Sequence, residues 1–187
     1  MNPTNIDRLW WEGRSAKDPF DFHGGLCGKA EIAPYYQHKW EDPKWQIRYL
    51  EKAKQFSEWS KDATKIGAIC VTENGSVIAQ GYNGFPRGIY DDPEMLSVRG
   101  GRKLDYMNHA EMSCIFNASY EGISLKNTVM AVSGLSPCKE CAKAIVSVGI
   151  IGVITTNRET PERWRENMEI ADEIFKKKGV WVKKIEL

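Results

Sequence analysis

The sequence has almost no net charge, and this shortage excludes one large class of function. Its 26 lysine and arginine residues are balanced by 25 aspartate and glutamate residues, which leaves a formal net charge of +1. No basic run exceeds the triplet Lys176–Lys178. Proteins that hold duplex nucleic acid by its phosphates present a broad basic face. We therefore expect no such face here.

A long apolar run and a secretion signal are also missing. No segment approaches the ~18 apolar residues of a membrane span. The first twenty residues carry charged side chains that interrupt any signal-peptide core: Asp7, Arg8, Glu12, Arg14, Lys17 and Asp18. Cysteine is sparse and odd in number: Cys27, Cys70, Cys114, Cys138 and Cys141. We expect a cytoplasmic protein with reduced thiols and no membrane contact, because this set does not suit a disulfide framework.

The chain divides into two parts by its pattern. Residues 1–41 show no helical or strand periodicity, and we interpret them as an N-terminal arm of unknown role. The arm is either packed on the domain or partly disordered, and its aromatic residues favour packing. Residues 42–187 have the length and the 42% apolar content of one domain with its own core.

Within residues 42–187, helical and strand patterns alternate. Asp42-Pro43 is a helix start, and Asn74-Gly75 between two apolar runs is a hairpin turn. The patterns predict helices over 43–61, 110–119, 138–148 and from Thr160 to about 178, and strands over 65–71, 76–82, 127–134, 150–156 and 180–187. Helical crossovers imply parallel neighbours. We expect an α/β fold with αβα layers, whose mixed five-stranded sheet ends in two parallel strands.

Metal-binding side chains stand at the starts of two of these helices. Cys138 and Cys141 are three residues apart, so their sulfurs share one face of a first helical turn. His109 begins the preceding helix, and neighbouring helix starts meet at one edge of such a sheet. Two thiolates and one imidazole leave a fourth position for water, which is the pattern of a catalytic zinc site. Glu111, two residues after His109, can address the same cavity and move protons.

Other interpretations of the same residues remain open. Cys138 and Cys141 also fit a redox dithiol or two core cysteines, and the metal could stabilise a nucleic-acid-binding module without catalysis. His23, Cys27 and His38 offer at most three scattered ligands in a glycine-rich segment, so we expect no second metal there.

Four segments together resemble a known family. "SKDATKIGAICV", "GYNGFPRG", "KLDYMNHAE" and "LSPCKECAKAI" are similar to the zinc-dependent cytidine/deoxycytidylate deaminases, and the "GYNGFPRG" loop is typical of the deaminases of deoxycytidylate (dCMP). The spacing H-x-E…P-C-x-x-C is itself the signature of zinc nucleobase deaminases. The resemblance spans about residues 45–187.

The resemblance implies a reaction and a substrate site. The reaction is hydrolytic deamination of dCMP to dUMP, the thymidylate precursor, with release of ammonia. Zinc would be held by His109, Cys138 and Cys141, with Glu111 as the proton shuttle. Further contacts would come from Asn83 to the sugar 3′-hydroxyl, the Ala110 amide to the base carbonyl, the Ser136 carbonyl to the amino group and Lys103 to phosphate. A different cytosine or adenine substrate, as nucleoside, modified dCMP or polynucleotide, is the alternative.

The resemblance also implies regulation and assembly. In regulated members a loop like Gly81–Asp92 binds dCTP as activator or dTTP as inhibitor. In this chain the triphosphate would be contacted by Lys61, Gly84 and Arg87, and Asp91 or Asp92 would hold an accompanying Mg²⁺. Members of this family are commonly homo-oligomers, and a hexamer is expected.

Overall fold

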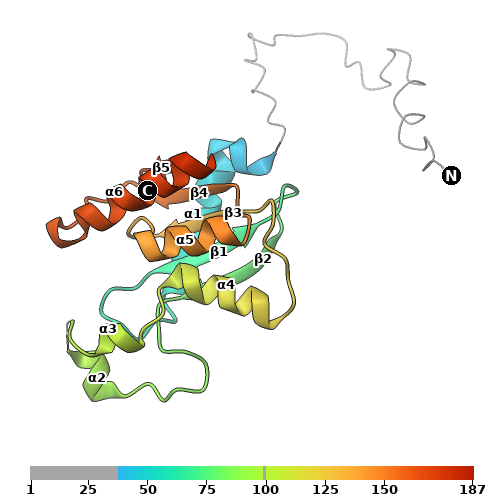
Figure 1. The fold of residues 1–187 in the computed structure, drawn as a ribbon. Coiled ribbons are helices and arrows are strands. Elements are labelled where there is room, and N and C mark those ends of the chain that lie inside the picture. Colours follow the sequence, from blue (N-terminus) through green and yellow to red (C-terminus); the bar gives the residue numbers. More distant parts are fainter. Residues whose placement is uncertain (1–37, 99) are drawn as a thin grey trace, which may run out of the picture. The chain divides into compact units, whose positions relative to one another are not determined.

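A five-stranded sheet organises the protein, and its strand order is β2-β1-β3-β4-β5. The computed structural model describes residues 38–98 and 100–187, which belong to one compact unit, Tyr36–Leu187. Its elements are η1 (Lys39–Glu41), α1 (Pro43–Ser57), β1 (Gly67–Val71), β2 (Val77–Tyr82), α2 (Pro93–Ser97), α3 (Lys103–Tyr106), α4 (Ala110–Tyr120), β3 (Val129–Ser133), α5 (Lys139–Ser147), β4 (Gly152–Thr156), η2 (Glu162–Trp164), α6 (Arg165–Lys178) and β5 (Trp181–Ile185) (Figure 1). The predicted arm lies outside the described residues up to position 37.

The sheet is mixed, as the alternating patterns predicted. Strand β1 pairs antiparallel with both β2 and β3, whereas β3–β4 and β4–β5 are parallel. Strands β2 and β3 therefore run in the same direction with β1 between them. Because α4 follows β2 and α5 follows β3, both helices begin at the same edge of the sheet. This shared edge brings the predicted metal ligands into one place.

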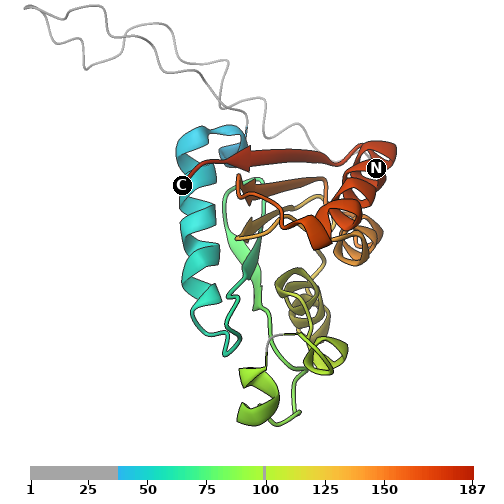
Figure 2. The same cartoon turned by 90° about the vertical axis from the view of Figure 1, so that its left-hand side faces the viewer.

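The helices cover the two faces of the sheet unequally. Figure 2 shows α1 alone on one face and α4, α5 and α6 on the other. Successive residues of β1 divide between the two cores, because side chains alternate along a strand. Ile69 and Val71 pack beneath α1, and Ala68 and Cys70 pack beneath the three helices. The predicted αβα layers are confirmed.

Helix α1 is shorter than its pattern predicted. It starts as expected, since Asp42 accepts a hydrogen bond from the Lys44 amide at 2.9 Å. It ends at Ser57, not at residue 61. The chain turns there, and the hydroxyl of buried Ser60 donates to the Asn83 carbonyl at 2.7 Å. The helical spacing could not show that this long-range contact ends the helix early.

Residues just before the predicted helix start at residue 42 also pack on the core. Trp40 in η1 is buried against α1, and the side-chain amide of Gln46 donates to the Trp40 carbonyl at 2.7 Å. Seven of the nine predicted helices and strands match the observed bounds to within two residues, and the exceptions are α1 and α6. The helix predicted from Thr160 begins at Arg165, because the residues before it form the separate 3-10 helix η2. Along the described residues, no helix combines the length and apolar character that crossing a membrane requires.

A long excursion connects β2 to α4, and it contains two short helices that the sequence did not predict. Helices α2 and α3 interrupt the expected loop and polar connection. Backbone hydrogen bonds between Gly84 and Asn108, at 2.9 and 3.1 Å, join the two ends of the excursion. A buried ion pair from Lys103 to Asp62, at 2.9 Å, fastens α3 to the segment before β1. The excursion is therefore held against the body of the protein.

Helix α4 lies unusually close to β2, and Gly81 makes this approach possible. A β-carbon at Gly81 would lie 2.7 Å from the Ala110 carbonyl oxygen and still nearer to the Cys114 amide. Both neighbours are helical backbone, which cannot turn aside as a side chain can. The position of the first turn of α4 therefore depends on this glycine.

We predict that Gly81→Ala destabilises the protein by about 1–3 kcal/mol, because overpacking against backbone forces α4 away from β2. Gly84→Ala is the matched control, since its β-carbon would meet nothing nearer than a Tyr82 ring atom at 3.6 Å. Denaturant unfolding of both variants measures the difference. Equal free energies of unfolding would show that α4 can move without cost.

Candidate metal centre and substrate pocket

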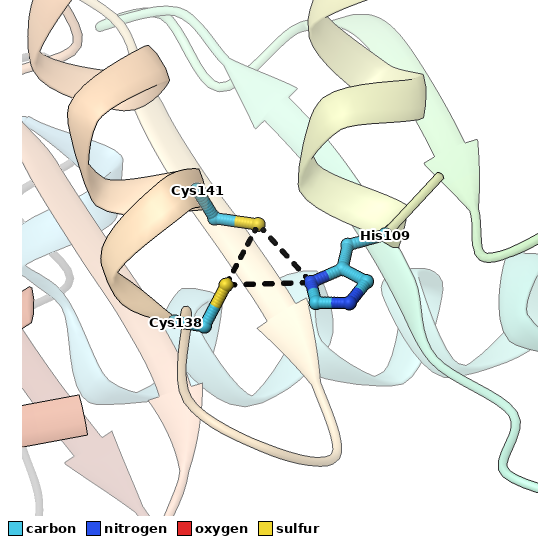
Figure 3. Close-up of side chains that lie close together, drawn as sticks. All are labelled: His109, Cys138 and Cys141. Carbon is cyan, nitrogen blue, oxygen red and sulfur yellow. Dashed lines mark hydrogen bonds between the residues drawn. The ribbon is translucent and has the colours of Figure 1, made fainter. Parts of the chain in front are cut away.

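His109 is fixed at the start of α4 by its backbone. It is the N-cap residue, with φ −69° and ψ 157°, and its carbonyl accepts the first helical hydrogen bond from Ser113 at 2.9 Å. The preceding residue, Asn108, is paired with Gly84. These constraints on both sides direct the imidazole toward α5 (Figure 3).

Cys138 and Cys141 occupy the corresponding position on α5. Cys138 is the N-cap residue and Cys141 lies in the first turn, so both sulfurs face His109. Pro137 precedes them and fixes the chain direction into the helix. The positive end of the helix dipole favours thiolates at this position.

The three ligand atoms form a triangle of the size that zinc requires. The Nδ1 atom of His109 lies 3.4 Å from Cys138 Sγ and 3.5 Å from Cys141 Sγ, and the two sulfurs are 3.7 Å apart. Tetrahedral zinc with Zn–S of about 2.3 Å and Zn–N of about 2.0–2.1 Å needs edges of about 3.5 Å and about 3.8 Å. The donor set and its spacing therefore fit zinc with one position left for water. Among the described residues, His109, Cys138 and Cys141 are the one cluster of His, Cys, Asp or Glu side chains close enough together to hold a metal ion.

The protons of this triangle are distributed unevenly. A hydrogen bond with Cys141 lowers the pKa of Cys138 to about 3, and the same contact together with burial raises the pKa of Cys141. The Cys138 thiolate in turn raises the pKa of His109 to about 9. At neutral pH the metal-free triangle thus carries one thiolate, one thiol and one imidazolium.

Glu111 lies in the first turn of α4 beside the triangle. Its side chain is 4% exposed, and burial raises the pKa of its carboxyl group. A carboxyl group with a raised pKa is suited to gain and lose a proton near neutral pH. Two residues apart within a helix, the side chains of His109 and Glu111 would point to nearly opposite sides. His109 has an extended backbone and precedes the helix, so both side chains can face the same cavity.

A cavity of about 280 Å³ opens beside the triangle. Its wall includes the predicted residues His109, Glu111, Cys138, Asn83, Ala110, Ser136 and Lys103. It also includes residues that the motifs did not identify, among them Asp62, Met107, Arg163, Trp164 and Met168. The structure therefore brings together every predicted catalytic, metal and substrate residue.

Two of these predicted residues already have protein partners. Asn83 accepts a hydrogen bond from the Ile66 amide and donates one to the Thr64 carbonyl, both at 2.8 Å. Lys103 pairs with Asp62 at 2.9 Å and reaches the Leu96 carbonyl at 3.3 Å. Asn83 therefore supports the wall of the cavity as well as facing it, and the charge of Lys103 is compensated.

The predicted effector residues lie outside the wall of this cavity and contact different elements. Lys61 pairs with Asp91 at 2.8 Å, and Asp92 caps α2 by accepting from the Glu94 amide at 2.9 Å. Arg87 turns to α4, where it donates to Asn117 at 3.1 Å and lies over the Tyr120 ring. Gly84 takes part in the bridge to Asn108. Of the arm residues, His38 stacks on Trp40, and His23 and Cys27 lie outside the described residues.

Fold and site together define an α/β protein with a zinc centre of the catalytic type, and comparison with known proteins gives its family. Residues 43–157 match the cytidine and deoxycytidylate deaminase zinc-binding region. The chain is 36% identical to a probable deoxycytidylate deaminase of Drosophila melanogaster over 139 residues, which cover 69% of this chain and 67% of that protein. It is 32% identical to the deoxycytidylate deaminase of Mus musculus, with 75% and 79% covered.

A solved structure agrees with these relatives. The dCMP deaminase of the cyanophage S-TIM5, crystallised with dCMP and dUMP, superposes with a TM-score of 0.61 at 27% identity and covers 77% of this chain and 98% of its own. The chain belongs to the cytidine and deoxycytidylate deaminase family. The predicted family and zinc are confirmed, and the redox-dithiol, core-cysteine and binding-module interpretations of Cys138 and Cys141 lose their support.

We predict that zinc binding releases about two protons per ion near neutral pH, one each from His109 and Cys141, because both must be deprotonated to ligate. The sign follows from the raised pKa of each group: zinc affinity falls as the pH is lowered. Competition with a chelator between pH 6.5 and 8 should show roughly a hundredfold change in affinity per pH unit. An affinity independent of pH would contradict this proton distribution.

Proposed function

We propose that the protein is a dCMP deaminase, which converts dCMP and water to dUMP and ammonia. The observation that carries the proposal is the buried Glu111 carboxyl group facing the same cavity as a three-ligand zinc triangle. A purely structural zinc site would be closed by a fourth protein ligand and would need no proton carrier. The relatives named as deoxycytidylate deaminases support the substrate.

Each residue of the cavity has a chemical task in this proposal. His109, Cys138 and Cys141 would hold zinc, which when bound would supply the Lewis acidity that lowers the pKa of water toward about 7. Glu111 would accept a proton from the attacking water at its carboxylate and deliver it to the N3 atom of cytosine; it would then take the second proton from the hydroxyl group added at C4 and transfer it to the amino group, which leaves as ammonia. Its burial supports this role, since a desolvated carboxyl group holds its proton closer to neutral pH.

The backbone at the two helix starts would orient the base. The Ala110 amide is at the first position of α4, where helical amides have no partner within the helix, and it would donate to the base carbonyl. The Ser136 carbonyl would accept from the amino group that leaves. Asn83 would meet the sugar 3′-hydroxyl with the hydrogen-bonding capacity that Thr64 and Ile66 leave unused, since its amide has two donors and two acceptor sites.

The rival substrates differ from dCMP in what surrounds the cytosine. A cavity of about 280 Å³ is close to the lower end of small-molecule sites, ~300–1,000 Å³. This size favours a single nucleotide. A free nucleoside, a modified dCMP or a base extruded from a polynucleotide would occupy the same position beside the zinc. Rates of deamination measured for each substrate therefore have to distinguish them.

Regulation remains a proposal from the family resemblance. Binding of dCTP or dTTP with Mg²⁺ near Lys61, Gly84, Arg87, Asp91 and Asp92 would require the Lys61–Asp91 pair to open, because that pair compensates both charges in the present arrangement. Assembly as a homo-oligomer, with a hexamer favoured, and a cytoplasmic location where the two thiol ligands stay reduced, belong to the same proposal.

We expect zinc-loaded protein to release ammonia from dCMP with a higher kcat/KM than from CMP, deoxycytidine or a single-stranded oligonucleotide. A charge-assisted phosphate contact contributes about 1.5–3 kcal/mol, which corresponds to about tenfold to a hundredfold between dCMP and deoxycytidine. Chelator-treated protein is the control and should be inactive. If the oligonucleotide were the best substrate, the proposal of dCMP would fail while the deaminase chemistry stood.

We predict that Glu111→Gln keeps about one zinc per chain and loses nearly all turnover, because Glu111 moves protons but is not a ligand. Cys141→Ala is the matched comparison, since it removes a ligand from the same cavity and should lose the metal. Metal analysis and ammonia release, measured on the same preparations, separate the two effects. A folded but zinc-free Glu111→Gln protein would show that Glu111 is a ligand.

A further inference from the structure

The cavity needs a positive group if it is to hold a substrate phosphate, and the described residues of its wall offer few. The cationic side chains in the wall are Lys103, His109 and Arg163. His109 is committed to the metal triangle, where it is a neutral ligand once zinc is bound. Among the residues that the structure describes, the choice for phosphate therefore lies between Lys103 and Arg163.

Lys103 is poorly placed to bind an anion. It is 4% exposed, its partner Asp62 is 8% exposed, and two of its three N–H groups are directed to Asp62 and Leu96. Asp62 also lies in the wall of the cavity. A phosphate that approached the Lys103 ammonium would meet the Asp62 carboxylate beside it, and taking Lys103 for itself would leave Asp62 buried without a counter-charge. The Lys103–Asp62 pair acts as a neutral unit.

Arg163 has neither restriction. It is exposed in η2, it lines the cavity, and it forms no hydrogen bond or ion pair with the rest of the described residues. The following residue, Trp164, lies edge-to-face against the His109 ring at a centroid distance of 6.3 Å, which fixes η2 beside the metal centre. Arg163 also precedes α6, whose positive dipole end adds to its charge. A guanidinium group presents a planar fork of donors that matches phosphate oxygens.

We infer that Arg163 is the residue that recognises the 5′-phosphate of the substrate and sets the preference for nucleotide over nucleoside. The inference rests on the proposed function and names the residue that gives it monophosphate specificity. Arg163 lines the same cavity as the metal ligands and Glu111, and its long side chain can extend to the phosphate of a nucleotide whose base lies beside them. The Lys103–Asp62 pair holds α3 in the wall and contributes no net charge.

The test uses zinc-loaded full-length protein and two ligands that are not turned over, dUMP and deoxyuridine. Titration calorimetry should show that Arg163→Gln weakens dUMP binding by about tenfold to a hundredfold and leaves deoxyuridine binding unchanged. Arg163→Lys should restore part of the loss, because it returns the charge without the fork. Arg165→Gln is the matched control, since Arg165 is exposed, pairs with Glu162 and is outside the cavity wall, so dUMP affinity should not change.

Three outcomes would overturn the inference. The first is unchanged dUMP affinity in Arg163→Gln. The second is an equal loss for dUMP and deoxyuridine, which would indicate that Arg163 shapes the cavity and does not contact phosphate. The third is a loss of dUMP preference in the charge-neutral double variant Asp62→Asn/Lys103→Met but not in Arg163→Gln, which would assign phosphate to Lys103.

Turnover separates this inference from the proposed function. If the wild-type protein deaminates dCMP but Arg163→Gln keeps its preference over deoxycytidine, the function stands and the inference fails. If Arg163→Gln loses dUMP affinity selectively while no preparation deaminates dCMP, the phosphate site stands and the proposed reaction fails.

Discussion

The close approach of α4 to β2 is the constraint on which the metal centre depends. Gly81 allows the backbone of Ala110 and Cys114 to lie against the strand, and the bridge between Gly84 and Asn108 fixes the residue before His109. Helix α5 is placed independently, by the parallel pairing of β3 and β4. The triangle forms because two separately anchored helices start at one edge of the sheet. A small shift of either helix would change sulfur–nitrogen distances that now fit zinc closely.

The charge distribution of the centre follows from this placement. Two cysteines and a histidine crowded at helix starts cannot all keep their ordinary protonation states, so Cys138 is a thiolate and His109 an imidazolium before metal arrives. The thiolate and the imidazolium compensate each other, and zinc would take the place of the protons on His109 and Cys141. Glu111 next to it is buried and has a raised pKa, which keeps a second full negative charge out of the centre. The site thus assigns metal binding to His109, Cys138 and Cys141 and proton transfer to Glu111.

Sequence was informative wherever a feature depends on neighbouring residues, and less so where it depends on distant ones. The periodic patterns identified every strand of the sheet, and the spacing of Cys138, Cys141 and His109 identified the metal ligands, because ligand geometry on a helix start is local. The early end of α1 and the two helices of the excursion were missed. Each is set by contacts such as Ser60 to Asn83 or Lys103 to Asp62, which link segments that no local pattern connects.

The same limit explains how the sequence could suggest Lys103 for the phosphate. Its position shortly before His109 identifies it as a cation near the cavity, and the structure agrees on that position. A motif does not show whether the charge of Lys103 is already paired. Here Asp62, from a different segment, compensates it. Arg163, in contrast, stands in no recognisable motif, yet the turn of η2 carries it to the cavity without a partner among the described residues. In a protein of nearly zero net charge, recognition of an anion depends on which cation is left uncompensated, and that can be decided only once the ion pairs are known.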